Sequence, residues 1–391
     1  MKLELIATAT FGLEAVVKRE IEGLGYKILR SEDGKITFLG DESALVRANL
    51  WLRCADRVLL KQGEFEAREF EELFQQTKGI PWEQLIPPDG KFTVTGTSVK
   101  STLHSVPACQ SIVKKAVVER LGEYYGMEHF PETGASYTIK VTMLKDRATI
   151  TVDTSGEGLH KRGYRKASVP APLKETLAAA MINLSFWNKD RILVDPMCGS
   201  GTIAIEAAMI GRNIAPGLNR HFAFEDWELI PDEVISREKK AAYEAIDQSG
   251  KLQIYGYDID DRAIEAAKAN ADLAGVSEDI LFKQMAVKDF RPEGQGGIII
   301  TNPPYGERVG EKEKIEKIYM DINALLKEHP DWSCFAVTPD KGFEKKALGR
   351  PADRRRKLYN GNIQVCYYQY HGEKPQLTEG GKESGEKSDE K

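Results

Sequence analysis

The stretch RILVDPMCGSGTIAIEAAMI, residues 191–210, decides the fold class of this chain. It begins with a short apolar run that is typical of a buried strand, continues through a turn with glycines at 199 and 201, and ends in a predicted helix. The same order of strand, turn and helix recurs at residues 252–275. Strands that alternate with helices in this way predict an α/β fold with a doubly wound, Rossmann-like sheet.

The segments after this repeat complete the predicted sheet. Further strands are expected within residues 280–290 and at 298–300, and the latter is apolar enough to be covered on both faces. Residues 355–372 predict an antiparallel closing hairpin, for which Asn360-Gly361 fits a two-residue turn. Between Gly211 and Lys251 lies an insertion, either a lid or a packed excursion, and we favour the packed excursion.

The preceding half of the chain has a different texture. Helical and strand patterns mix over residues 1–165, with a hairpin signal at Asp33-Gly34, so a separate α+β region is predicted there. The catalytic part is expected to span 166–371. The final twenty residues, 372–391, contain one large apolar side chain and are predicted to be disordered.

Composition excludes several classes of protein. The chain has 391 residues, 41% hydrophobic content and a net charge of −5. No apolar run approaches the roughly 20 residues that span a bilayer, so no membrane association is expected. Five scattered cysteines form no CxxC pair or Cys/His cluster, which predicts no metal site and favours reduced thiols in a cytoplasmic protein.

The first strand-to-helix turn carries Asp195 just before its glycines. The turn is neither GxGxxG nor a P-loop, so a triphosphate is not indicated. An acid at this position repels a pyrophosphate but suits a cation, and S-adenosylmethionine carries a sulfonium and an ammonium. The alternative for Gly199 and Gly201 is tight packing without a ligand.

Acids also follow the next two strands. Asp258 can accept hydrogen bonds from both ribose hydroxyls of such a cofactor, whereas Asp260 is as well suited to capping the following helix. Asp289 is placed to accept from the adenine amino group, with a solvated loop acid as the alternative. Together these acids predict a cofactor site along one edge of the sheet.

The fourth strand ends in Asn302-Pro303-Pro304-Tyr305, which matches the amino-methyltransferase motif of class I methyltransferases. The Asn302 side-chain oxygen and the Pro303 carbonyl can accept the two N–H groups of an exocyclic base amine, a poor nucleophile that must be oriented. Tyr305 can stack on an extruded base. Asn302, Pro303 and Tyr305 are therefore the candidate catalytic residues.

With these motifs, the chain resembles the THUMP-domain methyltransferases, in particular the bacterial group of large-subunit rRNA guanine-N2 methyltransferases. Members are often labelled N6-adenine-specific DNA methylases because they share the Asn-Pro-Pro-Tyr motif. The resemblance also rests on SVKSTLHSVPACQSIVKKAVVERL (98–121), LHKRGYR (159–165) and APLKETLAAAMI (171–182). It implies a ferredoxin-like and THUMP region, with the THUMP domain at about 45–155 contacting structured RNA. It further implies that Glu175 helps to close the cofactor site.

The candidate RNA contacts are local, because residues 1–165 hold 23 basic and 23 acidic residues. Residues 158–174 contain five bases and no acid, with Tyr164 available to stack. A second basic group lies further upstream and a third at 354–357. The candidate RNA-binding residues are Lys100, Lys114, Lys115, Lys161, Arg162 and Arg165. The alternative for each group is a solvated surface.

The leading hypothesis is S-adenosylmethionine-dependent methylation of guanine N2 in 23S rRNA, on the free RNA or an assembly intermediate. The motif alone equally allows an adenine-N6 DNA methyltransferase, a tRNA guanine-N2 methyltransferase or a glutamine methyltransferase acting on protein. A non-catalytic RNA-binding assembly factor is the alternative from another class. The intact set of acids and glycines argues against this last alternative.

Overall fold

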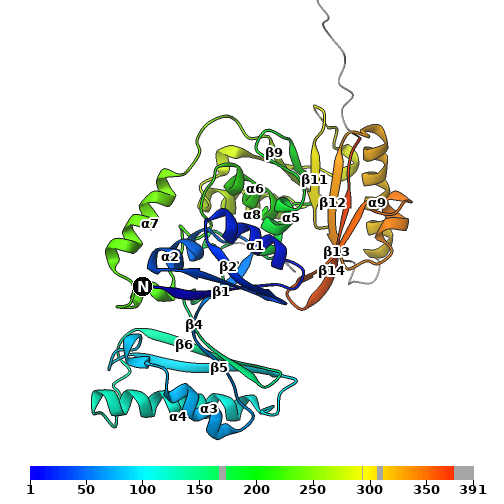
Figure 1. Cartoon of the computed structure of the whole chain (residues 1–391). Coiled ribbons are helices and arrows are strands. Elements are labelled where there is room, and N and C mark those ends of the chain that lie inside the picture. Colours follow the sequence, from blue (N-terminus) through cyan, green and yellow to red (C-terminus); the bar gives the residue numbers. More distant parts are fainter. Residues whose placement is uncertain (167–172, 293, 306–310, 374–391) are drawn as a thin grey trace, which may run out of the picture.

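The computed structural model describes residues 1–166, 173–292, 294–305 and 311–373. Most of the tail expected to be disordered, from residue 374 onward, lies outside the described residues. Two seven-stranded sheets organise the chain, one in each half of the sequence (Figure 1). The predicted combination of an N-terminal α+β region with a C-terminal Rossmann-like domain is confirmed.

The first sheet joins two units of the N-terminal region. Its strands, in spatial order, are β2 (Lys27–Glu32), β3 (Lys35–Gly40), β1 (Leu3–Ala9), β4 (Ala55–Glu66), β7 (Arg147–Asp153), β6 (Ser136–Leu144) and β5 (Lys91–Val99). Strand β4 pairs with β1 near its start and with β7 along most of its length, so one strand belongs to both units. Only β5 and β6 pair in parallel within this sheet.

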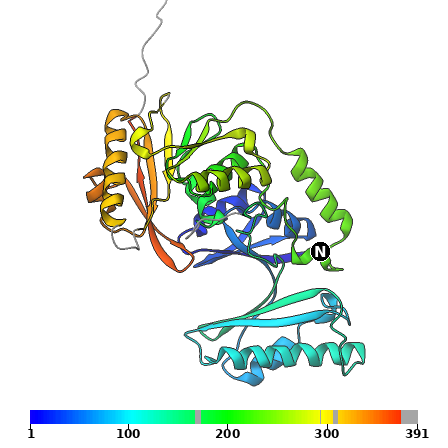
Figure 2. The ribbon, with the colours of Figure 1, turned by 180° about the vertical axis from the view of Figure 1, so that it is seen from behind.

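Helices cover each unit of this sheet separately. They are α1 (Glu14–Gly23) and α2 (Glu42–Trp51) in the first unit, and α3 (Phe70–Lys78), the short turn Trp82–Gln84 and α4 (Val106–Tyr125) in the second. The view from behind shows the second unit extending from the rest of the molecule on β4 and its neighbouring strands (Figure 2). This extended unit lies within the predicted THUMP region of about 45–155, whereas most of α2 and the start of β4, which also fall in that range, belong to the first unit.

The second sheet has the doubly wound arrangement. Its spatial order is β10 (Ile280–Gln284), β9 (Ile254–Asp258), β8 (Leu193–Asp195), β11 (Ile298–Thr301), β12 (Ser333–Thr338), β14 (Ile363–Tyr370) and β13 (Arg354–Asn360). Strands β10 to β12 run parallel, and β14 and β13 are antiparallel to their neighbours. The chain steps outward from β8 to β10 and returns to β11 beside β8. This topological switch point is where open α/β sheets hold their ligands.

The remaining elements surround this sheet. The helices are α5 (Glu175–Asn183), α6 (Thr202–Gly211), α7 (Asp232–Glu244), α8 (Asp261–Leu273) and α9 (Glu311–Glu328). The short helical turns are Ala223–Asp226, Ser277–Asp279, Val287–Asp289 and Glu344–Leu348. No helix among the described residues is long and apolar enough to cross a membrane.

The closing hairpin is present, but its turn is shifted by one residue from the prediction. Asn360 pairs with Ile363, so the two loop residues are Gly361 and Asn362. Gly361 has φ +62°, whereas neither Asn360 nor Asn362 has positive φ. A single glycine at the first loop position satisfies the twist of a hairpin, and this favours Gly361 over Asn360 there.

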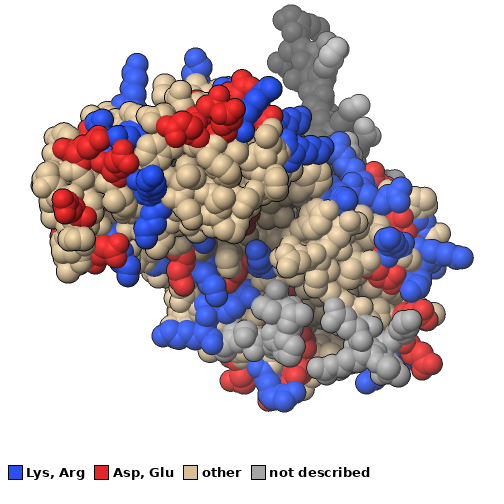
Figure 3. All heavy atoms as spheres, turned by 90° about the horizontal axis from the view of Figure 1, so that it is seen from below, with Lys and Arg blue, Asp and Glu red and all other residues tan. Residues whose placement is uncertain are grey.

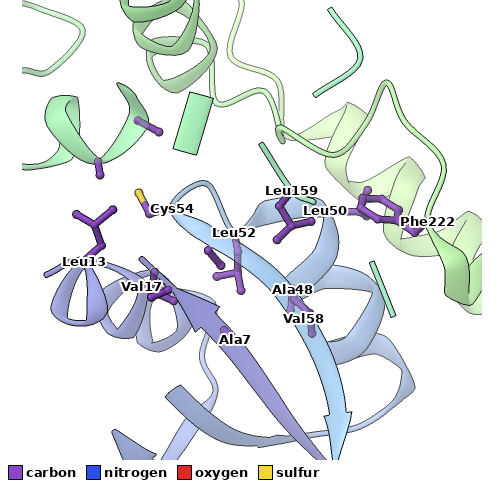
Figure 4. Close-up of a cluster of buried hydrophobic side chains, with 14 of the residues drawn as sticks. Ala7, Leu13, Val17, Ala48, Leu50, Leu52, Cys54, Val58, Leu159 and Phe222 are labelled. Atoms are coloured by element: carbon purple, nitrogen blue, oxygen red, sulfur yellow. The ribbon is translucent and has the colours of Figure 1, made fainter. Parts of the chain in front are cut away.

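The N-terminal and catalytic regions share one hydrophobic core. In Figure 4, Leu50 and Leu52 of the first unit lie beside Leu159 of the segment between the regions and Phe222 of the insertion. The insertion also reaches the extended unit, because the Trp227 ring stacks on Tyr137 at 5.0 Å and its indole N–H donates to the Ser136 carbonyl at 3.2 Å. It is therefore a packed excursion, and it ties all three parts together.

Candidate active site at the sheet switch point

Asp195 and Thr301 bring the two strands of the switch point together. Asp195 ends β8, Thr301 ends β11, and the Thr301 hydroxyl donates to Asp195 Oδ1 at 2.9 Å. The Met197 amide donates to the same oxygen at 3.2 Å. Burial is the main reason that the pKa of Asp195 is raised to about 7. Within the described residues no cationic side chain pairs with this carboxyl, so it suits a cationic ligand group.

The glycine turn is fastened to the neighbouring strand end. The Gly199 amide donates to Asp258 Oδ2 at 2.9 Å, and Gly199 has φ +51°. Gly201, with φ +83°, precedes α6, and a Cβ there would lie 2.9 Å from the Ala267 Cβ and 3.0 Å from Phe282. Gly201 thus packs tightly against α8 and β10, and its predicted approach to a ligand stays a prediction.

The two acids after β9 have separate roles in the fold. Asp260 Oδ1 accepts from the Arg262 amide at 3.0 Å, so Asp260 caps α8. Asp258 also accepts from the Asp260 amide at 3.0 Å, which fixes its carboxylate beside the glycine turn. Asp289 lies in the helical turn after β10 with an exposed side chain, near Lys288. Asp195 and Asp258 are the last residues of β8 and β9, and Asp289 follows β10, so the three acids lie at the ends of neighbouring strands.

The Asn-Pro-Pro-Tyr motif continues from β11 into the same edge. Asn302 Oδ1 is buried and has no hydrogen-bond partner among the described residues. A buried acceptor without a donor is costly, and such sites are filled when a ligand binds. Pro303 is buried, Pro304 is exposed, and Tyr305 lines a neighbouring cavity. The orphan acceptor therefore lies where an incoming N–H group is expected.

Glu175 starts α5 and forms an ion pair with Arg165 at 3.0 Å. Arg165 also donates to the Thr202 hydroxyl, at 2.7 Å, in the first turn of α6. Burial raises the pKa of Glu175. Arg165 therefore links the first turn of α5 to the first turn of α6, the helix that follows the glycine turn.

The cavity beside the motif has a volume of about 980 Å³. Its walls come from residues between 155 and 166, from Lys174 and Glu175, from the insertion and from the turn of the closing hairpin, and Tyr305 also lines it. The cavity thus adjoins the candidate catalytic residues.

Two residues proposed for RNA contact do not have the required exposure. Arg162 is only 3% exposed; it pairs with Glu206 at 3.3 Å and donates to the Leu159 carbonyl at 2.7 Å. Tyr164 is also buried, and its hydroxyl donates to Glu206 at 3.1 Å. The expectation that Arg162 binds RNA and that Tyr164 stacks is wrong, because both side chains are used in this internal network.

The other candidate RNA residues are accessible to different degrees. Lys161 is exposed, while Arg165 is half-buried in its pair with Glu175. Lys100, Lys114 and Lys115 are exposed on the extended unit. Lys100 follows β5, whereas the other two lie in the middle of α4, with Lys115 over the Phe74 ring at 5.3 Å.

Sequence reasoning missed Ile259 and Arg220. Ile259 follows Asp258 directly and is 67% exposed, which is unusual for an apolar residue at a strand end and offers a flat surface to a ring. An apolar residue directly after the acid at the strand end is a sequence signal that could have indicated this role. Arg220 donates to four carbonyls of residues 155–161, a contact between distant segments that sequence spacing does not reveal.

These residues fit S-adenosylmethionine. Asp195 offers an unpaired carboxyl for a cationic group, Asp258 an oriented carboxylate for hydroxyls, and Ile259 an apolar surface for a ring. Within the described residues there is no group of three or more His, Cys, Asp or Glu side chains that could hold a metal ion.

Comparisons with known families agree with this arrangement. Residues 162–369 match the family described as RMKL-like, methyltransferase domain. Residues 4–59 match the RlmL ferredoxin-like domain, and residues 67–153 match the THUMP domain. The predicted domain types are thus confirmed.

Individual relatives match nearly the whole chain. YpsC of Bacillus subtilis (strain 168), whose name places it provisionally among RNA methyltransferases, is 50% identical over 371 residues, 94% of this chain and 96% of its own. The ribosomal RNA large subunit methyltransferase K/L of Syntrophotalea carbinolica is 34% identical over 93% of this chain, which spans 52% of that longer protein.

A solved structure supplies the cofactor. The methyltransferase SMU.472, complexed with S-adenosylhomocysteine (SAH), is 43% identical, with a TM-score of 0.89 and coverage of 95% of this chain and 99% of its own. S-adenosylmethionine is therefore the cofactor of this fold and of this chain. The chain belongs to the RMKL-like methyltransferase family, with a ferredoxin-like domain and a THUMP domain ahead of its catalytic domain.

Proposed function

We propose that this protein methylates an exocyclic base amine in RNA, namely guanine N2 of 23S rRNA in the large subunit, acting in the cytoplasm. The observation that carries the amine chemistry is Asn302 Oδ1, which follows β11 and is buried without a hydrogen-bond partner in the described part of the chain. The RNA part rests on the THUMP domain, and the rRNA part on the named activity of the Syntrophotalea carbinolica relative.

The catalytic residues position the amine and stabilise it electrostatically. When bound, S-adenosylmethionine supplies an electrophilic methyl group. Asn302 Oδ1 and the Pro303 carbonyl accept the two N–H groups of the amine, which orients the nitrogen lone pair. Tyr305 stacks on the extruded base. Asn302 is no general base, so the proton leaves to solvent after transfer.

The cofactor contacts follow the strand ends. Asp258 accepts from the ribose hydroxyls, Asp289 from the adenine amino group, and Asp195 faces the cationic part. The backbone of Gly199 and Gly201 allows close approach, and Glu175 closes the site from α5. Lys100, Lys114, Lys115 and Lys161 are the proposed phosphate contacts, and Arg165 contributes only as far as its pair with Glu175 leaves it accessible.

The test is transfer of tritiated methyl groups to rRNA fragments, followed by nucleoside analysis. We expect label in N2-methylguanine from 23S rRNA, and none with tRNA or duplex DNA of matched length. Label in N6-methyladenine would overturn the base assignment and keep the amine mechanism. Label in tRNA or protein alone would overturn the rRNA assignment, and tight cofactor binding without any transfer would favour the non-catalytic assembly factor.

A further inference from the structure

The cavity beside Tyr305 has walls from three separate parts of the chain. Residues between 155 and 166, together with Lys174 and Glu175, form one wall. Asn219 and Arg220 of the insertion form another, and the hairpin residues Asn360 and Ile363 form a third. Figure 3 shows Lys and Arg side chains at the edge of the hollow on the face seen from below. This enclosure is unlike the open lysine groups on the THUMP domain.

The part of the wall around Lys161 is held in place by contacts with the insertion. Arg220 donates to the Gly158 carbonyl at 2.7 Å and to the Glu157 carbonyl at 2.7 Å, among other contacts. Gly163 has φ +96°, and a Cβ on it would lie 2.3 Å from the Asn219 carbonyl oxygen. The backbone at Gly163 admits only glycine without displacement, so residues 155–163 of the cavity wall are preorganised.

The cavity has an excess of positive charge. Its lysines at 161, 166 and 174 form no ion pair with a carboxylate in the described part of the chain. Arg220 donates to backbone carbonyls and lies over the Phe222 ring, so no carboxylate there neutralises it. Of the two acids in the lining, Glu175 is paired with Arg165, which leaves Glu157. Burial and then the surrounding cations hold the pKa of His160 at about 4, so this histidine adds no charge at neutral pH. Such an excess attracts a polyanion.

The shape selects among polyanions. Duplex RNA is recognised across its shallow groove by surfaces that face outward. A walled cavity of about 980 Å³ instead accommodates an unpaired strand of a few nucleotides. Tyr305 on the same cavity places that segment next to the nucleotide that reacts.

We propose that this cavity binds the phosphodiester backbone of a single-stranded RNA segment that flanks the target nucleotide, with Lys161, Lys166 and Lys174 as its phosphate contacts. This inference rests on the proposed RNA methylation. It adds that the RNA substrate is single-stranded where it lies in the cavity. It also assigns the closing hairpin a part of the substrate wall.

The test measures binding of a fluorescein-labelled 12-nucleotide oligouridine at several salt concentrations by anisotropy. The variant replaces Lys161, Lys166 and Lys174 with alanine together. A matched control replaces Lys240, Lys251 and Lys268, three exposed lysines on and between α7 and α8, with the same change in net charge. A duplex of equal length is measured in parallel, and cofactor affinity is measured for each protein.

The cavity variant should bind the oligouridine about tenfold or more weakly, and its salt slope should fall by about 2, since each single-strand phosphate contact contributes about 0.7. The control variant should bind like the wild type, the duplex should show a smaller change, and cofactor affinity should stay constant. Equal loss in the two variants, or a larger loss for the duplex, would overturn the proposal. A wild type that binds as expected but methylates no RNA would contradict the proposed function and not this site.

Discussion

The two seven-stranded sheets of this protein carry functional residues in different ways. In the catalytic sheet, parallel strands end at one edge, and the residues after β8, β9, β10 and β11 gather there. In the N-terminal sheet most neighbours are antiparallel, so strand ends alternate between edges and no such convergence arises. Chemistry is thus concentrated in one sheet, while the other distributes candidate RNA contacts over its surface.

The largest expected effect concerns Arg162, in the segment between the two regions. Arg162→Ala should lower the free energy of unfolding by about 3–5 kcal/mol, because it leaves Glu206 buried without its partner. The neighbouring Lys161→Ala should stay within about 0.5 kcal/mol. Urea denaturation measures both variants. Equal free energies of unfolding for Arg162→Ala and Lys161→Ala would mean that the buried pair of Arg162 and Glu206 does not hold the two regions together.

The second effect is a pH-dependent change in stability when Asp195, at the buried edge of the catalytic sheet, is replaced. The folded-state pKa of Asp195 is raised from 3.8 to about 7. The contribution of the protonated carboxyl to the free energy of unfolding is therefore fully present below pH 3.8 and is lost as pH rises through 7. Asp195→Asn keeps the acceptor for Thr301. The variant should therefore be more stable than the wild type at pH 8, by at most about 4 kcal/mol, with a smaller difference at pH 5. A difference that grew toward low pH would contradict the burial of this acid.

The third effect separates two acids at the end of β9. Asp258→Ala should weaken cofactor binding roughly tenfold or more, because an oriented charged acceptor is lost. Asp260→Ala should cost about 1 kcal/mol of stability through the lost helix cap and leave cofactor affinity unchanged. Calorimetric titration measures the affinities. The reverse pattern would move the ribose contact to Asp260.

The smallest effect tests the contact between the insertion and the THUMP domain at Trp227. Tyr137→Phe keeps the ring that stacks on Trp227 and removes a buried hydroxyl without a partner in the described structure, so stability should change by less than about 0.5 kcal/mol. Trp227→Phe should loosen the THUMP domain, because the donor to Ser136 is lost. Small-angle scattering should show a wider range of shapes for Trp227→Phe than for Tyr137→Phe. Identical scattering from the two variants would contradict the inference that the insertion holds the THUMP domain in place.

The same comparison explains how much the sequence could predict. Asp195, Asp258 and Asn302 were found because a parallel sheet brings successive strand ends together, and strand ends are visible in the sequence. Arg162 and Tyr164 were misassigned because nothing in a local charge pattern shows that Glu206 of α6 lies against them. Arg220 was missed for the same reason: its partners are backbone carbonyls some sixty residues earlier.

Gly201 and the closing hairpin show a finer limit. A glycine in a strand-to-helix turn is compatible with ligand approach and with packing, and only the nearness of Ala267 and Phe282 shows that Gly201 also packs tightly. The hairpin was predicted, but its register depends on which residue takes positive φ, and Gly361 takes it as the first loop residue.

The central claim is that Asn302 orients the amine at the chemical step, and Asn302→Ala tests it most directly. Single-turnover methyl transfer and cofactor affinity are measured on the same preparation, with exposed Asn188→Ala as the control. We predict that transfer falls about 10²- to 10³-fold, the loss expected for one preorganised polar contact, while cofactor affinity stays near that of the wild type. Full transfer activity in Asn302→Ala would contradict the account.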